Sequence, residues 1–397
     1  MVESTPLTQT LEKSDNTKQY VVSLPGTYPL RPLEPNAIRI RSIILSLTAN
    51  NFTHARLGYI LGLWDVWPAP PSLPSPYNDT QKYGRILPWS YAEVIGSTSL
   101  HFPAGTKLWG YMPLGTHPED LEVTIGHASE HSLEVSERGR HLLSIYNRYL
   151  AYPPDTDLPT GKHSFGWDAM MRVLFESSYM LSRCGFSWAE MPVHPLGTKM
   201  RWSNDDTDIA DAVAVLLALS RKTGLSFPYQ LRHGWLVSKQ PRKAIAVGLA
   251  KSRVFSEIAG LFDEVLLYDD FTKSDLSGPL GTDKATKVLL SNFGATSEAD
   301  EKWASVLKPL SARLQVLLIG SHPKVKGRGK LATHAKDPAS GIVQMNMTEL
   351  RGGAIVTEGE ARHFDLFDAE WTRFKSEGAV PGLKLTWGKG MDQIRKG

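Results

Sequence analysis

The first strong pattern in the chain is an alternation of apolar and charged residues at 38–41, which becomes an apolar run through residue 47. A period of two is typical of a half-buried strand, and the apolar run indicates that this strand enters a core. Further strand signals occur at 85–96 and 106–112, separated by glycines and prolines. Short strands divided by turn residues predict a small β-barrel over residues 36–130.

The pattern changes after about residue 165. Residues 167–182 carry apolar positions at helical spacing, and short apolar runs then alternate with helical segments. The sequence predicts strands at 199–202, 244–249, 263–270, 287–294 and 314–322, and helices at 207–222, 252–260 and 298–309. Strands that alternate with helices indicate a parallel sheet with crossover helices.

Three segments lack a clear period. Residues 1–35 are polar and proline-containing, so we expect a loose arm or an added edge strand. Residues 64–76 contain five prolines, which remove backbone donors, so this segment is predicted to be a stiff irregular loop that carries Trp64 and Trp67. Residues 331–397 are mixed and polar.

Composition limits the class of protein. A chain of 397 residues is expected to form two domains, and a net charge of +3 is too small to indicate a nucleic-acid partner. The basic cluster Lys324 to Lys330 is interpreted as a solvated loop. The sequence shows no apolar run long enough for a membrane span and no signal-peptide pattern, and it contains a single cysteine, Cys184. A cytoplasmic protein is therefore expected.

Residues 38–58 and 83–112 resemble the barrel of the medium-chain dehydrogenase/reductase superfamily, and Leu47-Thr-Ala-Asn-Asn51 with 246–271 resembles an uncharacterised bacterial and fungal branch of it. The resemblance implies a GroES-like β-barrel plus a Rossmann-type, doubly wound parallel sheet. The expected organisation is an arm at 1–35, a barrel domain at 36–160, a Rossmann-like domain at 161–330 and a C-terminal segment at 331–397 that returns to the barrel domain.

The zinc-containing members of that superfamily need cysteine and histidine ligands at separated barrel positions. Cys184 lies outside the barrel segments, and His127 with His131 reads as a turn rather than a ligand pair. No metal site is therefore expected, and Cys184 is interpreted as a small buried apolar residue.

The cofactor prediction rests on two segments. If 199–202 is the first strand, the phosphate loop is 202–211, which has no glycine and carries Asp205, Asp206 and Asp208. These acids would repel a diphosphate, although aspartates also serve as ordinary helix caps. Lys251, Ser252 and Arg253 follow the strand at 244–249, where NADP-preferring relatives bind the 2′-phosphate; a solvated helix start is the equal alternative.

The resemblance places a substrate between the two domains, beside the nicotinamide. Polar groups after the 47–51 strand are the leading candidates: Asn51 and His54 as catalytic residues, with Asn50 either binding substrate or capping the turn. Tyr146 is a further catalytic candidate and Asn147 a substrate-binding one, although helical aromatics usually belong to a core. Trp64 and Trp67 are expected to line an apolar pocket.

Two enzyme classes remain open. The first is NADP(H)-linked reduction of an activated C=C or C=O bond of an apolar, unsaturated small molecule in natural-product biosynthesis. The second is a cofactor-free cyclase or isomerase of the pericyclic, [4+2] type on the same scaffold, motivated by the acidic phosphate loop. A non-catalytic binding protein has no positive signal. The expected partner is a small substrate, with no nucleic acid and no membrane, and a homodimer is an open option.

Overall fold

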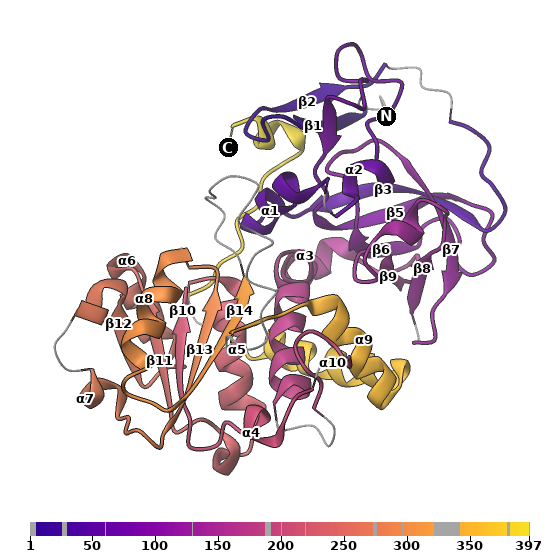
Figure 1. Cartoon of the computed structure of the whole chain (residues 1–397). Helices are drawn as coiled ribbons and strands as arrows, with labels where there is room; N and C mark the ends of the chain where they lie inside the picture. The colour runs from indigo at the N-terminus through magenta and orange to yellow at the C-terminus, as the bar shows by residue number, and fades with distance from the viewer. Residues whose placement is uncertain are drawn as a thin grey trace. The chain divides into compact units, whose positions relative to one another are not determined.

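The structure is a computed structural model. It describes residues 5–25, 30–59, 61–128, 130–186, 192–199, 201–218, 220–272, 276–295, 297–320, 342–378 and 382–396, so the basic cluster Lys324 to Lys330 lies outside the described residues. The chain divides into two compact units (Figure 1). The first, here the barrel unit, comprises Met1–Met170 and Leu385–Gly397; the second, the sheet unit, comprises Met171–Lys384.

The barrel unit is built on a closed six-stranded barrel. Its strands, in order around the barrel, are β3 (Ala37–Leu45), β5 (Trp89–Ser97), β6 (Lys107–Tyr111), β9 (Arg148–Tyr152), β8 (His131–Glu134) and β7 (Glu119–Ile125). Antiparallel pairing of β3 with both β5 and β7 closes the ring. The side chains of Ile38, Tyr91 and Leu108 are fully buried, as the alternating pattern predicts for inward-facing positions. The predicted barrel is confirmed.

The described part of the N-terminal segment forms two strands, one at the edge and one at the centre of a three-stranded sheet. Strand β1 (Leu7–Glu12) is the centre of a three-stranded sheet, with β2 (Gln19–Ser23) on one side and β4 (Tyr83–Arg85) on the other. Thr8, Gln9 and Thr10 are buried although they are polar. Pairing on both sides explains why the sequence did not indicate the central strand, because backbone hydrogen bonds to two neighbours hold a strand that its side chains alone do not predict.

Two helices precede the prolines of the 64–76 segment. Helix α1 (Ala49–Leu57) follows β3 directly, and α2 (Leu63–Val66) is a single helical turn before the prolines. The expectation that 64–76 is wholly irregular is therefore wrong at its start, because the first proline is Pro68 and the preceding residues keep their backbone donors. The last elements are η1 (Gly139–His141) and η7 (Met391–Lys396).

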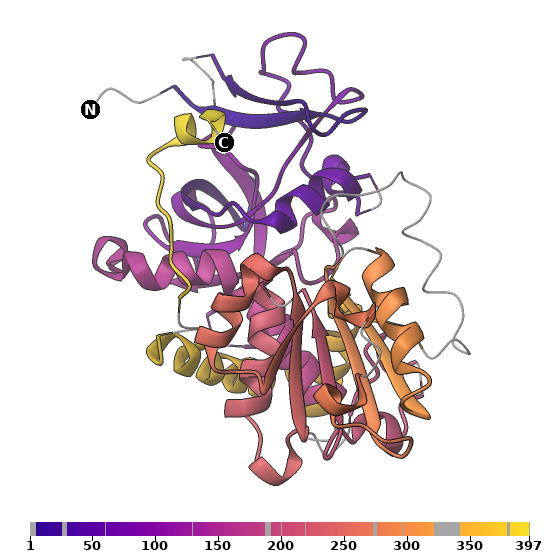
Figure 2. The ribbon, with the colours of Figure 1, turned by 90° about the vertical axis from the view of Figure 1, so that its left-hand side faces the viewer.

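The sheet unit contains a six-stranded parallel sheet (Figures 1 and 2). Its order across the sheet is β12 (Glu264–Leu267), β11 (Lys243–Gly248), β10 (Val213–Leu217), β13 (Lys287–Phe293), β14 (Arg313–Gly320) and β15 (Ile342–Gln344). In sequence order this is 3-2-1-4-5-6, the order of a doubly wound dinucleotide-binding sheet. The fold class predicted from the sequence, a GroES-like barrel plus a Rossmann-type sheet, is confirmed.

One strand was assigned wrongly from the sequence. The segment 207–222, predicted as a helix, contains the central strand β10, and 199–202 forms no strand among its described residues. All five residues of β10 are fully buried, and β11 and β13 pair with this strand on both sides. A strand buried on both faces is apolar throughout, and such a short run cannot be separated from a buried helix by its period.

The helices of the sheet unit connect and flank these strands. They are α4 (Asn204–Thr207), α5 (Lys222–His233), α6 (Ala250–Ala259), α7 (Ser277–Leu280), α8 (Ser297–Leu307), α9 (Met347–Glu358) and α10 (Glu360–Ser376), with the short turns η3 (Val237–Lys239) and η4 (Tyr268–Thr272). Helix α3 (Leu158–Met180) crosses the division between the units and continues as the π-helical turn η2 (Leu181–Gly185). No helix in the described ranges has the length and apolarity needed to cross a membrane.

The C-terminal segment divides between the units. Helices α9 and α10 belong to the sheet unit, where Phe374 of α10 packs on Phe175 of α3 at 4.6 Å and on Tyr229 of α5 at 4.7 Å between ring centroids. Only residues from Leu385 onwards group with the barrel unit. The expected return of all of 331–397 to the barrel domain therefore differs from the observed division, because the aromatic face of α10 is buried against α3 and α5.

Candidate functional site

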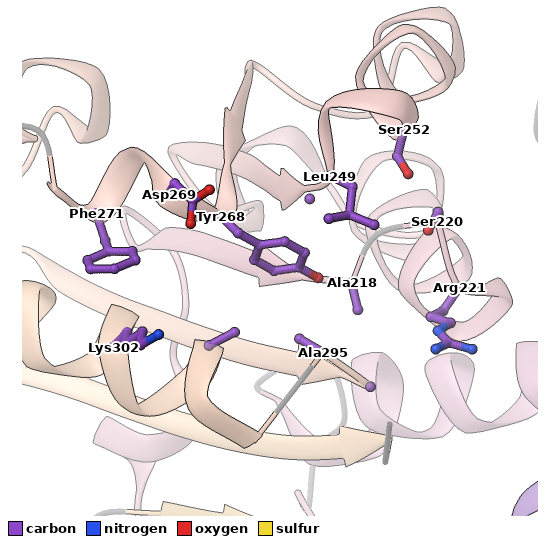
Figure 3. Close-up of a pocket in the computed structure, with 13 residues that line it drawn as sticks. Ala218, Ser220, Arg221, Leu249, Ser252, Tyr268, Asp269, Phe271, Ala295 and Lys302 are labelled. Carbon is purple, nitrogen blue, oxygen red and sulfur yellow. The ribbon is translucent and has the colours of Figure 1, made fainter. Parts of the chain in front are cut away.

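A cavity of about 290 Å³ lies in the sheet unit where the parallel strands end (Figure 3). Residues that follow β10, β11, β12 and β13 line it, together with α8. They are Ala218, Ser220, Arg221, Gly248, Leu249, Ser252, Tyr268, Asp269, Phe271, Gly294, Ala295, Ala299 and Lys302. Ligands of open α/β sheets bind at the carboxyl ends of the strands, where the strand order reverses, and β10 and β13 flank that point here.

The loop after β10 brings positive charge to one end of this cavity. Ala218 has a φ of 62° and starts the turn, and Arg221 is the N-cap of α5. The next residue, Lys222, has a pKa below its usual value because of burial and, secondarily, because of Arg221 beside it. The first turn of α5 contains no acidic residue, and no ion pair of Arg221 exists among the described residues. A helix start with two cations is suited to an anion.

Aromatic rings line the rest of the cavity. Tyr268 extends across its middle, with Arg221 at one end and Phe271 and Lys302 at the other (Figure 3). Burial raises the pKa of Tyr268, and a hydrogen bond from the backbone of Ala218 opposes that shift. The Nζ of Lys302 lies 5.8 Å from the centroid of the Phe271 ring. Flat aromatic surfaces beside cations can accept a planar, charged ligand.

The three residues predicted to bind the 2′-phosphate lie at the start of α6. Ser252 lines the cavity, whereas Lys251 and Arg253 do not. Lys251 is exposed, and the Nε of Arg253 donates to Glu257 Oε1 at 2.8 Å, one helical turn further on. The assignment of these residues to a cofactor stays a prediction.

The acids interpreted as blocking the phosphate site lie at the opposite end of the sheet. The Nζ of Lys287, the first residue of β13, donates to the backbone carbonyls of Asp206 at 2.9 Å and Asp208 at 2.8 Å and also to that of Asp205. Arg313, the first residue of β14, pairs with the Asp205 carboxylate. The identification of 202–211 as the phosphate loop is therefore wrong, because this segment precedes the first strand and lies at the amino ends of β13 and β14.

In the barrel unit, His54 is the centre of a buried polar group. His54 Nδ1 lies 2.6 Å from the hydroxyl of Tyr111, and Nε2 lies 3.2 Å from that of Tyr146 and 3.4 Å from the Asn50 amide nitrogen. Burial lowers the pKa of His54 to about 4, against a smaller opposite effect of the Leu87 carbonyl. The imidazole is therefore neutral at physiological pH and acts by hydrogen bonding.

In the structure Asn51 caps a helix and Asn50 contacts His54. Asn51 holds the start of α1: its Oδ1 accepts from the Thr48 N–H at 2.6 Å, and its Nδ2 donates to the Leu87 carbonyl at 3.3 Å. Thr48 and Asn51 thus form a capping box, which the spacing Thr48-x-x-Asn51 could have indicated. Asn50, the predicted cap, contacts His54 instead. The catalytic role proposed for Asn51 has no support from these contacts and stays a prediction.

Of the remaining candidates, the two tryptophans lie apart from both groups, whereas Tyr146 belongs to the His54 group. Trp64 and Trp67 are 6% and 3% exposed, and Trp64 packs in a core cluster with Leu11, Ala55 and Ile86. Neither tryptophan lines the cavity described above, so their role in a pocket stays a prediction. Tyr146 and Asn147 lie in a turn before β9 rather than on a helix.

Tyr111 and Arg221 are the residues that sequence analysis missed. Tyr111 ends a short barrel strand and reads as an ordinary inward-facing aromatic. Arg221 was placed inside a helix, although the polar sequence Ser220-Arg221-Lys222 directly after an apolar run could have indicated a strand end. Cys184 is buried, and burial raises its pKa to about 12. The described residues hold no group of three or more His, Cys, Asp or Glu side chains placed to bind a metal.

Comparison with known proteins supports the fold. Solved structures that resemble the chain include a mutant of enoyl thioester reductase from Candida tropicalis (TM-score 0.51, 11% identity, 99% of this chain and 96% of that chain). The mitochondrial 2-enoyl thioester reductase Etr1p/Etr2p heterodimer from the same yeast gives a TM-score of 0.53 at 11% identity over 99% and 96%. An Etr1p mutant in complex with NADP and crotonyl-CoA gives 0.54 at 12% identity over 99% and 95%.

At such identities the likeness concerns the fold alone. A search of curated proteins found no match. The sequence pattern of one protein family, described as a protein of unknown function (DUF2855), matches residues 45–396, which is most of the chain. The chain therefore belongs to the DUF2855 family.

Proposed function

We propose that this protein is an NADP(H)-linked reductase of an activated C=C or C=O bond in a small, unsaturated organic molecule. The observation that carries the proposal is the cavity at the carboxyl ends of β10, β11, β12 and β13, with Arg221 at the N-terminus of α5. A doubly wound sheet binds a dinucleotide at this place, with its diphosphate at the helix N-terminus that follows the first strand.

The residues present fit such a ligand. Arg221 and Ser220 offer donors for a diphosphate, and a guanidinium binds two phosphate oxygens at once. The residues that follow β11 are Leu249, Ala250, Lys251 and Ser252, so the position that an acid occupies in NAD-preferring sheets carries none. The loop has no glycine before Gly224, so side chains would replace part of the usual backbone contact. When bound, the cofactor supplies the hydride.

The barrel unit provides groups for the substrate. The Tyr146 hydroxyl and the Asn50 amide surround a neutral His54, and burial raises the pKa of Tyr146 to about 12, so its O–H persists at neutral pH. A phenol O–H can donate to a carbonyl oxygen and stabilise negative charge that develops there. The fold resemblance to reductases that act on enoyl thioesters supports a substrate whose C=C bond is conjugated to a carbonyl.

The observation that motivated the cofactor-free cyclase does not hold. That alternative was based on acids in the phosphate loop, and Asp205, Asp206 and Asp208 lie at the other end of the sheet. No contact among the described residues favours it over the reductase.

The experiment is a titration with NADPH and NADH, followed by tryptophan fluorescence, and then an assay of NADPH oxidation with crotonyl-CoA and 2-cyclohexenone as probes. We expect a micromolar Kd for NADPH and weaker binding of NADH. NADPH consumption should require the C=C bond, so butyryl-CoA is the matched control. The absence of binding of either nucleotide at millimolar concentration would exclude the proposal.

A further inference from the structure

Three side chains in the barrel unit form a chain of hydrogen bonds from the core toward the surface. Tyr111 is fully buried, His54 is 5% exposed, and Tyr146 is half-buried. The Tyr111 hydroxyl contacts His54 Nδ1 at 2.6 Å, and His54 Nε2 contacts the Tyr146 hydroxyl at 3.2 Å. The imidazole therefore links the hydroxyl of a fully buried residue to that of a half-buried one.

The buried end sets the direction of these bonds. Burial holds the pKa of Tyr111 well above its usual value, so its oxygen keeps its hydrogen. The His54 Nδ1 atom is the only hydrogen-bond partner of this hydroxyl among the described residues. Leaving a buried O–H without an acceptor is unfavourable, so Tyr111 donates and Nδ1 accepts. The neutral imidazole then has its hydrogen on Nε2.

This tautomer determines what Tyr146 can do. The Nε2–H donates to the Tyr146 oxygen. The structure places the Asn50 amide nitrogen 3.4 Å from Nε2, so this amide has to turn over before its oxygen can be a second acceptor. The hydrogen of Tyr146 is then available to a ligand. In the other tautomer Tyr146 would donate to His54 and could offer a ligand only lone pairs.

Ring packing keeps the three groups in place. The His54 ring stands edge-on to Tyr111 and Tyr146, with interplanar angles of 89° and 87°. The two tyrosine rings pack on each other with centroids 4.5 Å apart, and Trp89 packs against both. Such packing restricts ring rotation, so the direction of the hydrogen bonds is preserved.

We propose that Tyr111 is a positioning residue which, through His54, commits the Tyr146 hydroxyl to donating, so that the barrel unit binds the carbonyl oxygen of a ketone or thioester rather than a hydrogen-bond donor. The proposal rests on the proposed function for its substrate, but its geometry concerns the protein alone. It also assigns distinct roles: Tyr146 contacts the ligand, and Tyr111 acts through His54.

The test is ¹⁵N NMR of histidine-labelled protein at neutral pH, with the His54 signals identified by a His54→Gln variant. We expect protonated Nε2 and bare Nδ1 in the wild type and in Tyr146→Phe. Tyr111→Phe should shift His54 toward the Nδ1–H form. The matched control is Tyr149→Phe, which removes a buried hydroxyl that donates to the Tyr111 carbonyl but does not contact His54. A wild-type Nδ1–H tautomer would overturn the proposal even if Tyr111→Phe failed to fold.

Turnover supplies a second readout. With crotonyl-CoA, Tyr146→Phe should lower kcat by about 10²-fold or more and Tyr111→Phe by about tenfold, both with unchanged NADPH affinity. A Tyr111→Phe variant with wild-type kcat would contradict the positioning role. If the protein consumes no NADPH, the NMR result still decides the tautomer, so the failure of the reductase proposal and that of this one are distinguishable.

Discussion

The two ends of the parallel sheet differ in whether their cationic side chains are paired within the protein. At the amino ends, Lys287 donates to three backbone carbonyls and Arg313 pairs with Asp205, so each charge is used within the protein. At the carboxyl ends, Arg221 has no ion pair among the described residues and borders a cavity. The comparison teaches that a charged residue next to a Rossmann-type strand indicates a ligand only when no hydrogen bond or ion pair within the protein already uses its charge.

The largest effect is expected from Lys287→Ala. The lysine is 6% exposed, and its loss leaves three carbonyls without their donor, which should lower the free energy of unfolding of the sheet unit by about 3 kcal/mol. Urea denaturation followed by circular dichroism measures this. Lys308→Ala, which removes an exposed cation, is the control and should change little. NADPH affinity of folded Lys287→Ala should be unchanged; a specific loss of binding would mean that the two ends are coupled.

Lys287 should also give the sheet unit a characteristic pH dependence. Burial lowers its pKa from 10.5 to about 8, so between these values the unfolded chain binds more protons than the folded one. Stability from this residue therefore rises as pH increases from about 8 to 10.5, because loss of the proton relieves the desolvation of the charge. Unfolding midpoints of the wild type and of Lys287→Met across that interval measure it. An equal rise in both proteins would assign the effect to other groups.

Arg221→Ala should weaken NADPH binding by about 30-fold, the loss of one charge-assisted contact to phosphate. Because Arg221 has no ion pair among the described residues, stability should stay nearly constant. Isothermal titration calorimetry gives the affinity, and Arg221→Lys should restore part of it. Unchanged affinity in Arg221→Ala would remove the diphosphate from this end of the cavity.

The combined change Lys251→Ala and Arg253→Ala tests the 2′-phosphate assignment. We expect NADPH to bind about tenfold more weakly and NADH to change little, because only NADPH carries the 2′-phosphate. Glu257→Gln is the complementary variant: it releases Arg253 from its ion pair and should tighten NADPH. Parallel losses for both nucleotides would mean that these residues serve the structure of α6 instead.

The smallest effect is expected from Asp205→Asn. Its carboxylate is exposed and pairs with Arg313, so we expect a loss of stability below about 1 kcal/mol and no change in NADPH affinity. Calorimetric titration of the variant beside the wild type is sufficient. Tighter nucleotide binding would return Asp205 to the phosphate site and revive the cofactor-free alternative.

The sequence alone determined the class of fold. Residues 38–47 alternate and then become apolar, and apolar runs at 244–249 and 287–294 alternate with helical segments, so the barrel and the parallel sheet could be predicted. These patterns are local, because the spacing of apolar residues along the chain reflects the helix or strand to which they belong. The Lys251-Ser252-Arg253 segment could also be placed correctly at the start of a helix, since the strand before it is bounded clearly.

Tertiary structure alone decided the identity of β10 and the partners in the site. Residues 213–217 form a strand because β11 and β13 pair with them from segments 30 and 75 positions further along the chain, which no local period records. His54 meets Tyr111 and Tyr146 across separations of 57 and 92 residues, because closure of the barrel brings α1, β6 and the turn before β9 together. The hydrogen bonds and the pKa of a polar side chain depend on such neighbours. Strand pairing, rather than composition, determines which residues distant in sequence become neighbours.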